Sequence, residues 1–196
     1  ALDPSNPHTI WAGSGENNSQ RSVSFGDGVY RSRDGGQNWE NMGLKESEHI
    51  GMIVVDPRDS NTVFVAAQGP LWRSGGDRGL YKTTDGGAAW ARLATVQPAA
   101  AIPGCFPVRV LRMAMDPSNT NELYAALEVG GFIRSLDAGA TWEDMSGGFV
   151  ALSKEPHLAN HILSDNDAEG MLDLHALTMS ADQPGTIYAV NRMGLF

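Results

Sequence analysis

Short apolar runs separated by turns recur along the whole chain. Ile50–Val55, Val110–Met115 and Leu174–Met179 are three such runs, and each is followed by an Asp-containing turn and a second β-rich run, at 62–66, 122–126 and 186–189. Apolar runs of this length, bounded by Pro, Gly, Asp and Asn, are typical of strands and too short for ordinary helices. The pattern predicts pairs of antiparallel strands joined by tight turns.

A second motif, Ser/Thr-x-Asp-x-Gly-x-x-Trp, follows a short apolar and basic run at three places in the chain. Its aspartates lie 51 and 52 positions apart, close to the length of one four-stranded propeller blade. The motif residues are Ser32, Asp34, Gly36, Trp39, Thr83, Asp85, Gly87, Trp90, Ser135, Asp137, Gly139 and Trp142.

In chain order, one repeat reads strand, Asp turn, strand, variable loop, strand, Ser/Thr-x-Asp turn and a last strand. This order predicts an all-β fold, a partial β-propeller of about three and a half four-stranded blades. Blade 1 is expected at 1–45, blade 2 at 46–97, blade 3 at 107–148 and an incomplete blade 4 at 171–196, with a long loop insertion at 149–170. Since the repeat is interrupted at both ends, we expect a fragment whose open edges lead to self-association, for example as a dimer of about seven blades, or to a larger assembly.

The residue types of the repeated motif explain its role as a turn. An Asp side chain accepts hydrogen bonds from backbone N–H groups a few residues later, the Ser/Thr hydroxyl adds a second local bond, and Gly takes the positive-φ position. The Trp is expected to be buried between adjacent sheets. We therefore interpret Asp34, Asp85 and Asp137 as structural residues without a catalytic or metal-binding role.

Composition excludes several classes of protein. The formal net charge of −9 repels phosphate backbones, so nucleic acid is not an expected partner. No apolar stretch is long enough for a membrane span. The single cysteine, Cys105, cannot form an intrachain disulfide and is interpreted as a small buried apolar residue.

The three motifs resemble the Asp-box, or BNR-repeat, propellers, which include sialidases, xyloglucan-cleaving glycosidases, sortilin-type receptors and the photosystem II assembly factor with its bacterial relatives. Residues 1 to about 95 resemble large secreted bacterial BNR proteins described as glycosidase-like, and residues from about 107 resemble compact bacterial BNR proteins. The sequence leaves open whether one source or a fusion of two explains this difference. The resemblance implies a propeller and an extracytoplasmic location, but no activity, because enzymes and binding proteins share the motif.

Three functions remain open. The leading hypothesis is a module without catalytic activity that binds a protein or glycan through its loops; the others are a fragment of a glycoside hydrolase and a piece of chain with no activity of its own. A sialidase is disfavoured because the Arg-Ile-Pro signature of that family is absent. The catalytic candidates for a glycosidase, which needs two carboxyl groups, are Glu16, Glu48, Asp167 and Glu169.

The segment 165–170 begins like a calcium loop, with oxygen-bearing side chains at alternate positions before a Gly. Asp165, Asp167 and Glu169 are the candidate ligands, although no bidentate Glu follows at the later position that such a loop requires. The alternative is a polar loop or helix cap, and no other cofactor is expected. His157 and His161 lie four positions apart and would share one face of a helix, but the sequence places no third metal ligand beside them.

Overall fold

The structure is a computed structural model that describes residues 1–17, 23–102 and 108–196. Cys105 lies outside these residues. The chain divides into two compact units, Ala1–Leu93 (unit 1) and Ala94–Phe196 (unit 2). None of the helices in the described ranges has the length and apolar character needed to cross a membrane.

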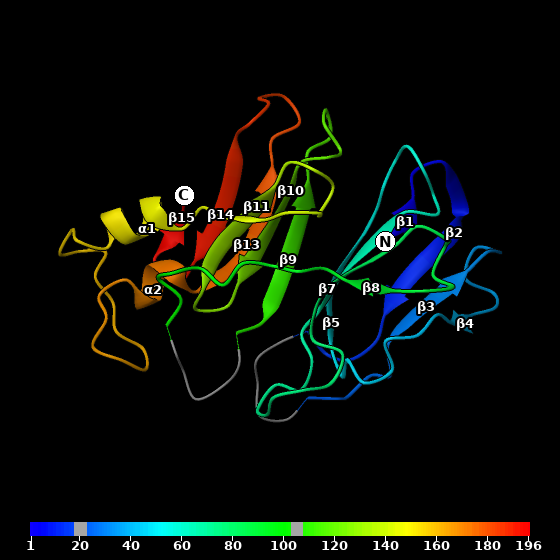
Figure 1. Cartoon of the computed structure of the whole chain (residues 1–196), viewed down its shortest axis with the longest axis horizontal. Coiled ribbons are helices and arrows are strands. Elements are labelled where there is room, and N and C mark those ends of the chain that lie inside the picture. Colours follow the sequence, from blue (N-terminus) through cyan, green and yellow to red (C-terminus); the bar gives the residue numbers. More distant parts are fainter. Residues whose placement is uncertain (18–22, 103–107) are drawn as a thin grey trace. The chain divides into compact units, whose positions relative to one another are not determined.

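Unit 1 consists of two four-stranded antiparallel sheets, each a meander in which strands adjacent in sequence are adjacent in the sheet (Figure 1). The strands of the first sheet are β1 (Leu2–Asp3), β2 (Asn6–Gly13), β3 (Val29–Ser32) and β4 (Glu40–Asn41). Those of the second are β5 (Ile50–Val55), β6 (Val63–Ala67), β7 (Gly79–Thr83) and β8 (Ala91–Arg92). A shared core, which includes Trp11, Val29, Ile53 and Val65, packs the two sheets together.

Unit 2 contains a four-stranded and a three-stranded antiparallel meander. The first comprises β9 (Val110–Met115), β10 (Leu123–Leu127), β11 (Gly131–Ser135) and β12 (Glu143–Asp144). The second comprises β13 (Leu174–Met179), β14 (Ile187–Asn191) and β15 (Gly194–Leu195). The prediction of an all-β fold built from short antiparallel strands is confirmed.

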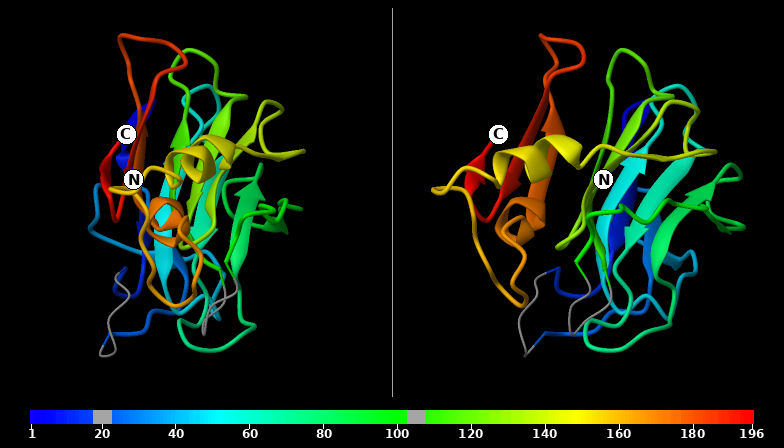
Figure 2. Two further views of the ribbon diagram at one scale, coloured as in Figure 1. Left: turned by 90° about the vertical axis from the view of Figure 1, so that its left-hand side faces the viewer. Right: turned by 60° about the vertical axis from the view of Figure 1, so that its left-hand side comes forward.

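Two short helices lie at the two ends of the segment that the sequence predicts as a loop at 149–170. They are α1 (Gly147–Leu152) and α2 (Glu169–Leu172), which lie close together at one side of unit 2 (Figure 2). Phe149 of α1 and Met171 and Leu172 of α2 are buried in the core of unit 2 with Leu174 and Tyr124. Burial of these apolar side chains, which lie far apart in sequence, accounts for the helical turns.

The three Asp-box turns have the same internal hydrogen bonds. In the first, the Ser32 hydroxyl donates to Asp34 Oδ1 at 2.7 Å and accepts from Gly36 N–H at 2.8 Å, and Asn38 N–H donates to Asp34 Oδ1 at 2.9 Å. Thr83 with Asp85 and Ser135 with Asp137 repeat this arrangement. The third motif position is Gly in each turn because its φ lies near 90°.

The hydrogen bonds of these turns stabilise the ionised carboxylates. Backbone and side-chain donors of Asn38, followed by the Ser32 hydroxyl, lower the pKa of Asp34 to about 2. Thr141 and Ser135 lower the pKa of Asp137 to about 2 in the same way. The stability that these carboxylates contribute is present above their ordinary pKa of 3.8 and is lost only as the pH falls through about 2.

The motif tryptophans do not form the common buried layer that the sequence predicted. Trp39 is 44% exposed, and its Nε1 donates back to Gly36 O of its own turn at 3.0 Å. Trp142, half-buried, makes the same bond to Gly139 O, whereas Trp90 donates to Met42 O of the preceding sheet at 2.7 Å. The prediction of burial is wrong for Trp39, because no sheet precedes it among the described residues of unit 1.

Removal of one Asp-box hydroxyl tests the structural role of the turns. We expect Ser32→Ala to lower the free energy of unfolding by about 1 to 2 kcal/mol, because the partly buried N–H of Gly36 and the carboxylate of Asp34 lose their partner. Urea denaturation measures the change, and Ser74→Ala, at an exposed position of the same unit, is the control. Equal stability of the two variants would contradict the assignment.

Candidate functional site on the loop face

In each of the three four-stranded sheets, the connection between the second and third strands lies at the end opposite the Asp-box turn, and we call this end the loop face. Three connections meet on the loop face of unit 1: Gly26 N–H donates to Glu48 O at 2.7 Å, and Asp77 N–H donates to Glu46 O at 3.1 Å. At Gly15, whose φ is 88°, a Cβ atom would lie 2.0 Å from Glu48 O. Only glycine fits at this crossing, so the sequence fixes the close approach of the loops.

Two aromatic side chains on this loop face are exposed to solvent. Phe25, in the β2–β3 connection, is 72% exposed, and Trp72, in the β6–β7 connection, is 52% exposed. Phe25 contacts the buried His49 edge-on with ring centroids 5.5 Å apart, and Arg73 Nη2 pairs with Glu48 Oε1 at 2.6 Å. These contacts tie both aromatic loops to the same β4–β5 connection. We call Phe25, Trp72 and the Glu48–Arg73 pair the aromatic platform.

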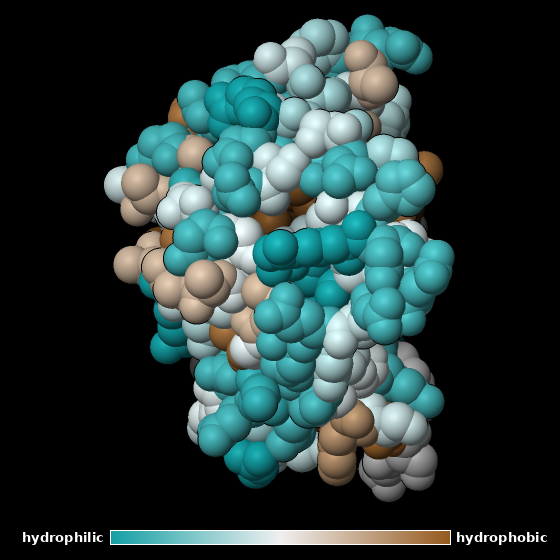
Figure 3. Space-filling view, turned by 90° about the vertical axis from the view of Figure 1, so that its right-hand side faces the viewer, coloured by the Kyte–Doolittle hydropathy of each residue, from teal (hydrophilic) through white to brown (hydrophobic). Residues whose placement is uncertain are grey.

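Figure 3 views the molecule from the right-hand side of Figure 1, and the surface there is mainly hydrophilic, with apolar residues in small separate places. Large exposed aromatic rings are typical of interaction sites, so the two rings on connected loops favour a binding surface. The repeat pattern identifies neither Phe25 nor Trp72, because both lie in variable connections. An aromatic side chain within a segment otherwise rich in Gly and Ser is the sequence signal that marks them.

The structure separates the four catalytic candidates. Glu16 and Glu48 lie on adjoining loops of unit 1, where Glu16 is exposed and accepts a hydrogen bond from Ser24 N–H at 3.2 Å. Asp167 and Glu169 belong to unit 2. Of the two in unit 2, Asp167 is exposed and pairs with His161 Nε2 through Oδ1 at 2.6 Å.

Glu169, a candidate both for catalysis and for calcium binding, is held by backbone N–H groups. Its side chain is fully buried, and its carboxylate accepts hydrogen bonds from the N–H groups of Ile162 at 2.6 Å, Leu163 at 2.8 Å and Ser164 at 3.0 Å. Burial alone would raise the pKa of Glu169, but these donors outweigh it and hold the pKa below the ordinary value of 4.5. A glycosidase acid needs a raised pKa, whereas the pKa of Glu169 is lowered.

The expected calcium loop is a closed polar loop. Within the ranges that the structure describes, no three His, Cys, Asp or Glu side chains form a group that could hold a metal ion. Glu169 is turned toward backbone N–H groups, and the Asn166 side chain accepts from Ala168 N–H at 2.9 Å. His157 and His161 lie outside both helices of this segment and do not share a helix face.

Polar residues pair at the loop-face ends of the first two strands of three sheets. The backbone bond is the same in each: Gln68 N–H donates to His49 O, Glu128 N–H to Arg109 O and Arg192 N–H to Asp173 O. In the β9–β12 sheet the side chains also form an ion pair, with Arg109 Nη2 2.5 Å from Glu128 Oε2 and both side chains buried. In the β13–β15 sheet the two charges are exchanged, because the acid, Asp173, comes first in the chain and Arg192 second. Arg192 Nη1 lies 3.8 Å from Asp173 Oδ2.

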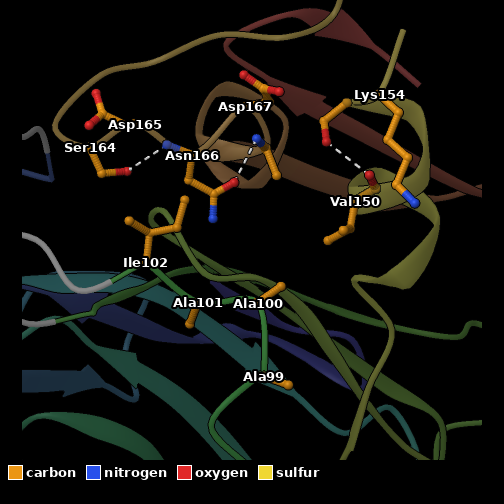
Figure 4. A pocket seen from close by; sticks show the side chains of 12 residues that line it. Ala99, Ala100, Ala101, Ile102, Val150, Lys154, Ser164, Asp165, Asn166 and Asp167 are labelled. Carbon is orange, nitrogen blue, oxygen red and sulfur yellow. Dashed lines mark hydrogen bonds between the residues drawn. The ribbon is translucent and has the colours of Figure 1, made fainter.

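Unit 2 also contains an open hollow of about 750 Å³. One side is formed by residues 99–102, which lie between β8 and β9 in the sequence. The other side is formed by the end of α1 and the loop before α2 (Figure 4). The lining residues are Ala99, Ala100, Ala101, Ile102, Val150, Ser153, Lys154, Ser164, Asp165, Asn166, Asp167 and Ala168.

Comparison with known proteins identifies the repeat. The family model described as BNR/Asp-box repeat matches residues 30–41, which contain the first Asp-box turn. The chain therefore contains a BNR/Asp-box repeat. A xyloglucanase from a Paenibacillus species is 30% identical over 122 residues, which are 58% of this chain and 11% of the xyloglucanase.

Two solved propeller structures resemble this chain in fold. An ancestral GH74 enzyme has a TM-score of 0.63 and 17% identity over 99% of this chain and 21% of its own. YCF48 from Cyanidioschyzon merolae has a TM-score of 0.55 and 16% identity over 97% of this chain and 48% of its own. These likenesses confirm the prediction of a partial β-propeller. The chain spans about a tenth of the xyloglucanase and about a fifth of the GH74 enzyme.

Proposed function

We propose that the loop face of unit 1 binds a neutral polysaccharide, whose sugar rings pack on Phe25 and Trp72. The observation that supports this proposal is the exposure of both rings on loops that contact the same β4–β5 connection, one through Phe25 and His49 and the other through the Glu48–Arg73 pair. The C–H face of a pyranose ring is apolar and packs on an aromatic ring, while its hydroxyl groups exchange hydrogen bonds with charged side chains. The aromatic platform offers both kinds of contact.

The sequence similarity to a xyloglucanase favours a β-glucan such as xyloglucan as the bound polysaccharide. It supports binding more directly than cleavage, because this chain spans only 11% of that enzyme. We propose a binding module without hydrolytic activity, placed outside the cytoplasm where such polysaccharides occur.

Glycoside hydrolysis is the second candidate function, and one observation favours it. The contact of Gly15 with Glu48 O brings the loops that carry Glu16 and Glu48 together on the same face as the aromatic platform. Two carboxyl groups on adjoining loops are the minimum that hydrolysis requires, one as acid and the other as base or nucleophile.

Titration with xyloglucan oligosaccharides tests the proposed binding. We expect Trp72→Ala to weaken binding at least about tenfold in isothermal titration calorimetry, because the sugar loses a stacking surface. Trp39→Ala is the matched control, since Trp39 is also a partly exposed tryptophan of unit 1 but belongs to an Asp-box turn at the opposite end of its sheet.

Equal loss of affinity in the two tryptophan variants, or no loss in either, would contradict the platform. The same oligosaccharides, analysed for newly formed reducing ends, separate the two candidate functions. We expect no new reducing ends to form. If the unaltered chain released reducing ends and Glu48→Gln did not, hydrolysis would be favoured over binding.

A further inference from the structure

The hollow of unit 2 has an apolar side made of small residues. Residues 99–102 form it, and their position is fixed because Ala99 N–H donates to Asp144 Oδ2 at 3.1 Å and Ile102 N–H donates to Val129 O at 3.1 Å. Ile102 is buried in the core of unit 2, whereas the neighbouring alanines carry only methyl groups. This side can accommodate small apolar groups of a ligand.

The opposite side of the hollow is a polar loop with a fixed conformation. The buried Glu169 holds the backbone of Ile162, Leu163 and Ser164, and Asn160 N–H donates to Asp167 O at 3.0 Å. The loop therefore presents its side chains without a large further loss of conformational entropy when a ligand binds. A cluster of carboxylates on a mobile loop would lack this property.

Residues of both charges are among those that line the hollow, and they come from different elements. Asp165 and Asp167 belong to the loop before α2, and Lys154 belongs to the segment after α1 (Figure 4). Within the described ranges, the side chains of Asp165 and Lys154 form no hydrogen bond or ion pair, whereas Asp167 uses Oδ1 for His161. Asp165 is thus available to a cation, and Lys154 to a carbonyl or another acceptor.

The combination matches the chemistry of a polypeptide main chain with one positive side chain. We propose that the hollow binds an extended peptide segment, with a Lys or Arg side chain at Asp165, main-chain carbonyl groups near Lys154 and small apolar side chains on the alanines. Its volume lies within the range of pockets that hold ligands of this size. None of the described lining residues is aromatic, so a sugar ring has no surface on which to stack.

This site is independent of the aromatic platform, which belongs to unit 1. Its test uses short acetylated and amidated peptides with a central Lys flanked by Ala, and the same peptides with Gln in place of Lys. In fluorescence polarisation with the full chain, we expect the Lys peptides to bind at least about tenfold more tightly than the Gln peptides, and added salt to reduce this difference.

Asp165→Asn is expected to abolish the preference for Lys, with an unchanged thermal unfolding midpoint because Asp165 is exposed. Asp182→Asn, at an exposed position of unit 2 outside the hollow, is the control and should keep the preference. Trp72→Ala should also keep it, which separates this result from the proposed polysaccharide binding. Absence of binding at about 1 mM peptide, an intact preference in Asp165→Asn, or binding of oligosaccharides that Asp165→Asn removes would overturn the proposal.

Discussion

Replacement of Arg109 by Met is expected to lower the free energy of unfolding of unit 2 by about 3 to 5 kcal/mol. Arg109 is fully buried, and its guanidinium lies 2.5 Å from the buried carboxylate of Glu128. Loss of the guanidinium leaves this carboxylate in an environment of low dielectric constant without its countercharge. Guanidinium chloride denaturation of the full chain, followed by circular dichroism, measures the change.

Two further variants show whether charge is the cause. The double variant Arg109→Met with Glu128→Leu should recover most of the lost stability, because no unpaired charge remains buried. Arg134→Met is the control, because Arg134 and Glu143 form an ion pair in the same sheet and both side chains are partly exposed. This variant should lower the free energy of unfolding by less than about 1 kcal/mol. A double variant no more stable than Arg109→Met would show that packing, and not the ion pair, determines the loss.

Trp11→Ala is expected to lower the free energy of unfolding by about 3 to 5 kcal/mol, because it removes the largest buried side chain of unit 1. The Trp11 ring packs edge-on against Trp90 at 6.2 Å, and the Arg31 guanidinium lies 5.4 Å from its centroid. The control is Trp39→Ala, which should cost less than about 1 kcal/mol because Trp39 is 44% exposed. Urea denaturation that ranked the two variants in the opposite order would contradict this account of the core.

These two tryptophans show where prediction from sequence succeeds and where it ends. The Asp-box turns could be predicted in detail, because each turn is closed by hydrogen bonds among residues a few positions apart. The burial of a tryptophan depends on whether another sheet packs on it, so identical motifs place Trp39 in solvent and Trp90 against the preceding sheet. Trp11 lies in the core, but no Asp-box motif contains it.

The candidate sites were less predictable than the fold for the same reason. The spacing of Asp165, Asp167 and Glu169 resembles the start of a calcium loop, but spacing does not show that the chain folds back to place backbone N–H groups around Glu169. Phe25 and Arg73, the neighbour of Trp72, meet the same connection only after two sheets have formed and packed. Contacts between distant segments determine both sites, whereas local contacts determine the turns.

The Asp-box turns and the connections of the loop face differ in how far their length and sequence can change. The turns set the pairing of the third and fourth strands through hydrogen bonds that need no other part of the chain. The connections between the second and third strands differ in length, from residues 14–28 in one sheet to residues 192–193 in another. An insertion, deletion or exchange of such a connection leaves the strand register at the other end unaltered. A single scaffold of this kind can therefore acquire new ligands through successive changes of its connections while each sheet retains its fold.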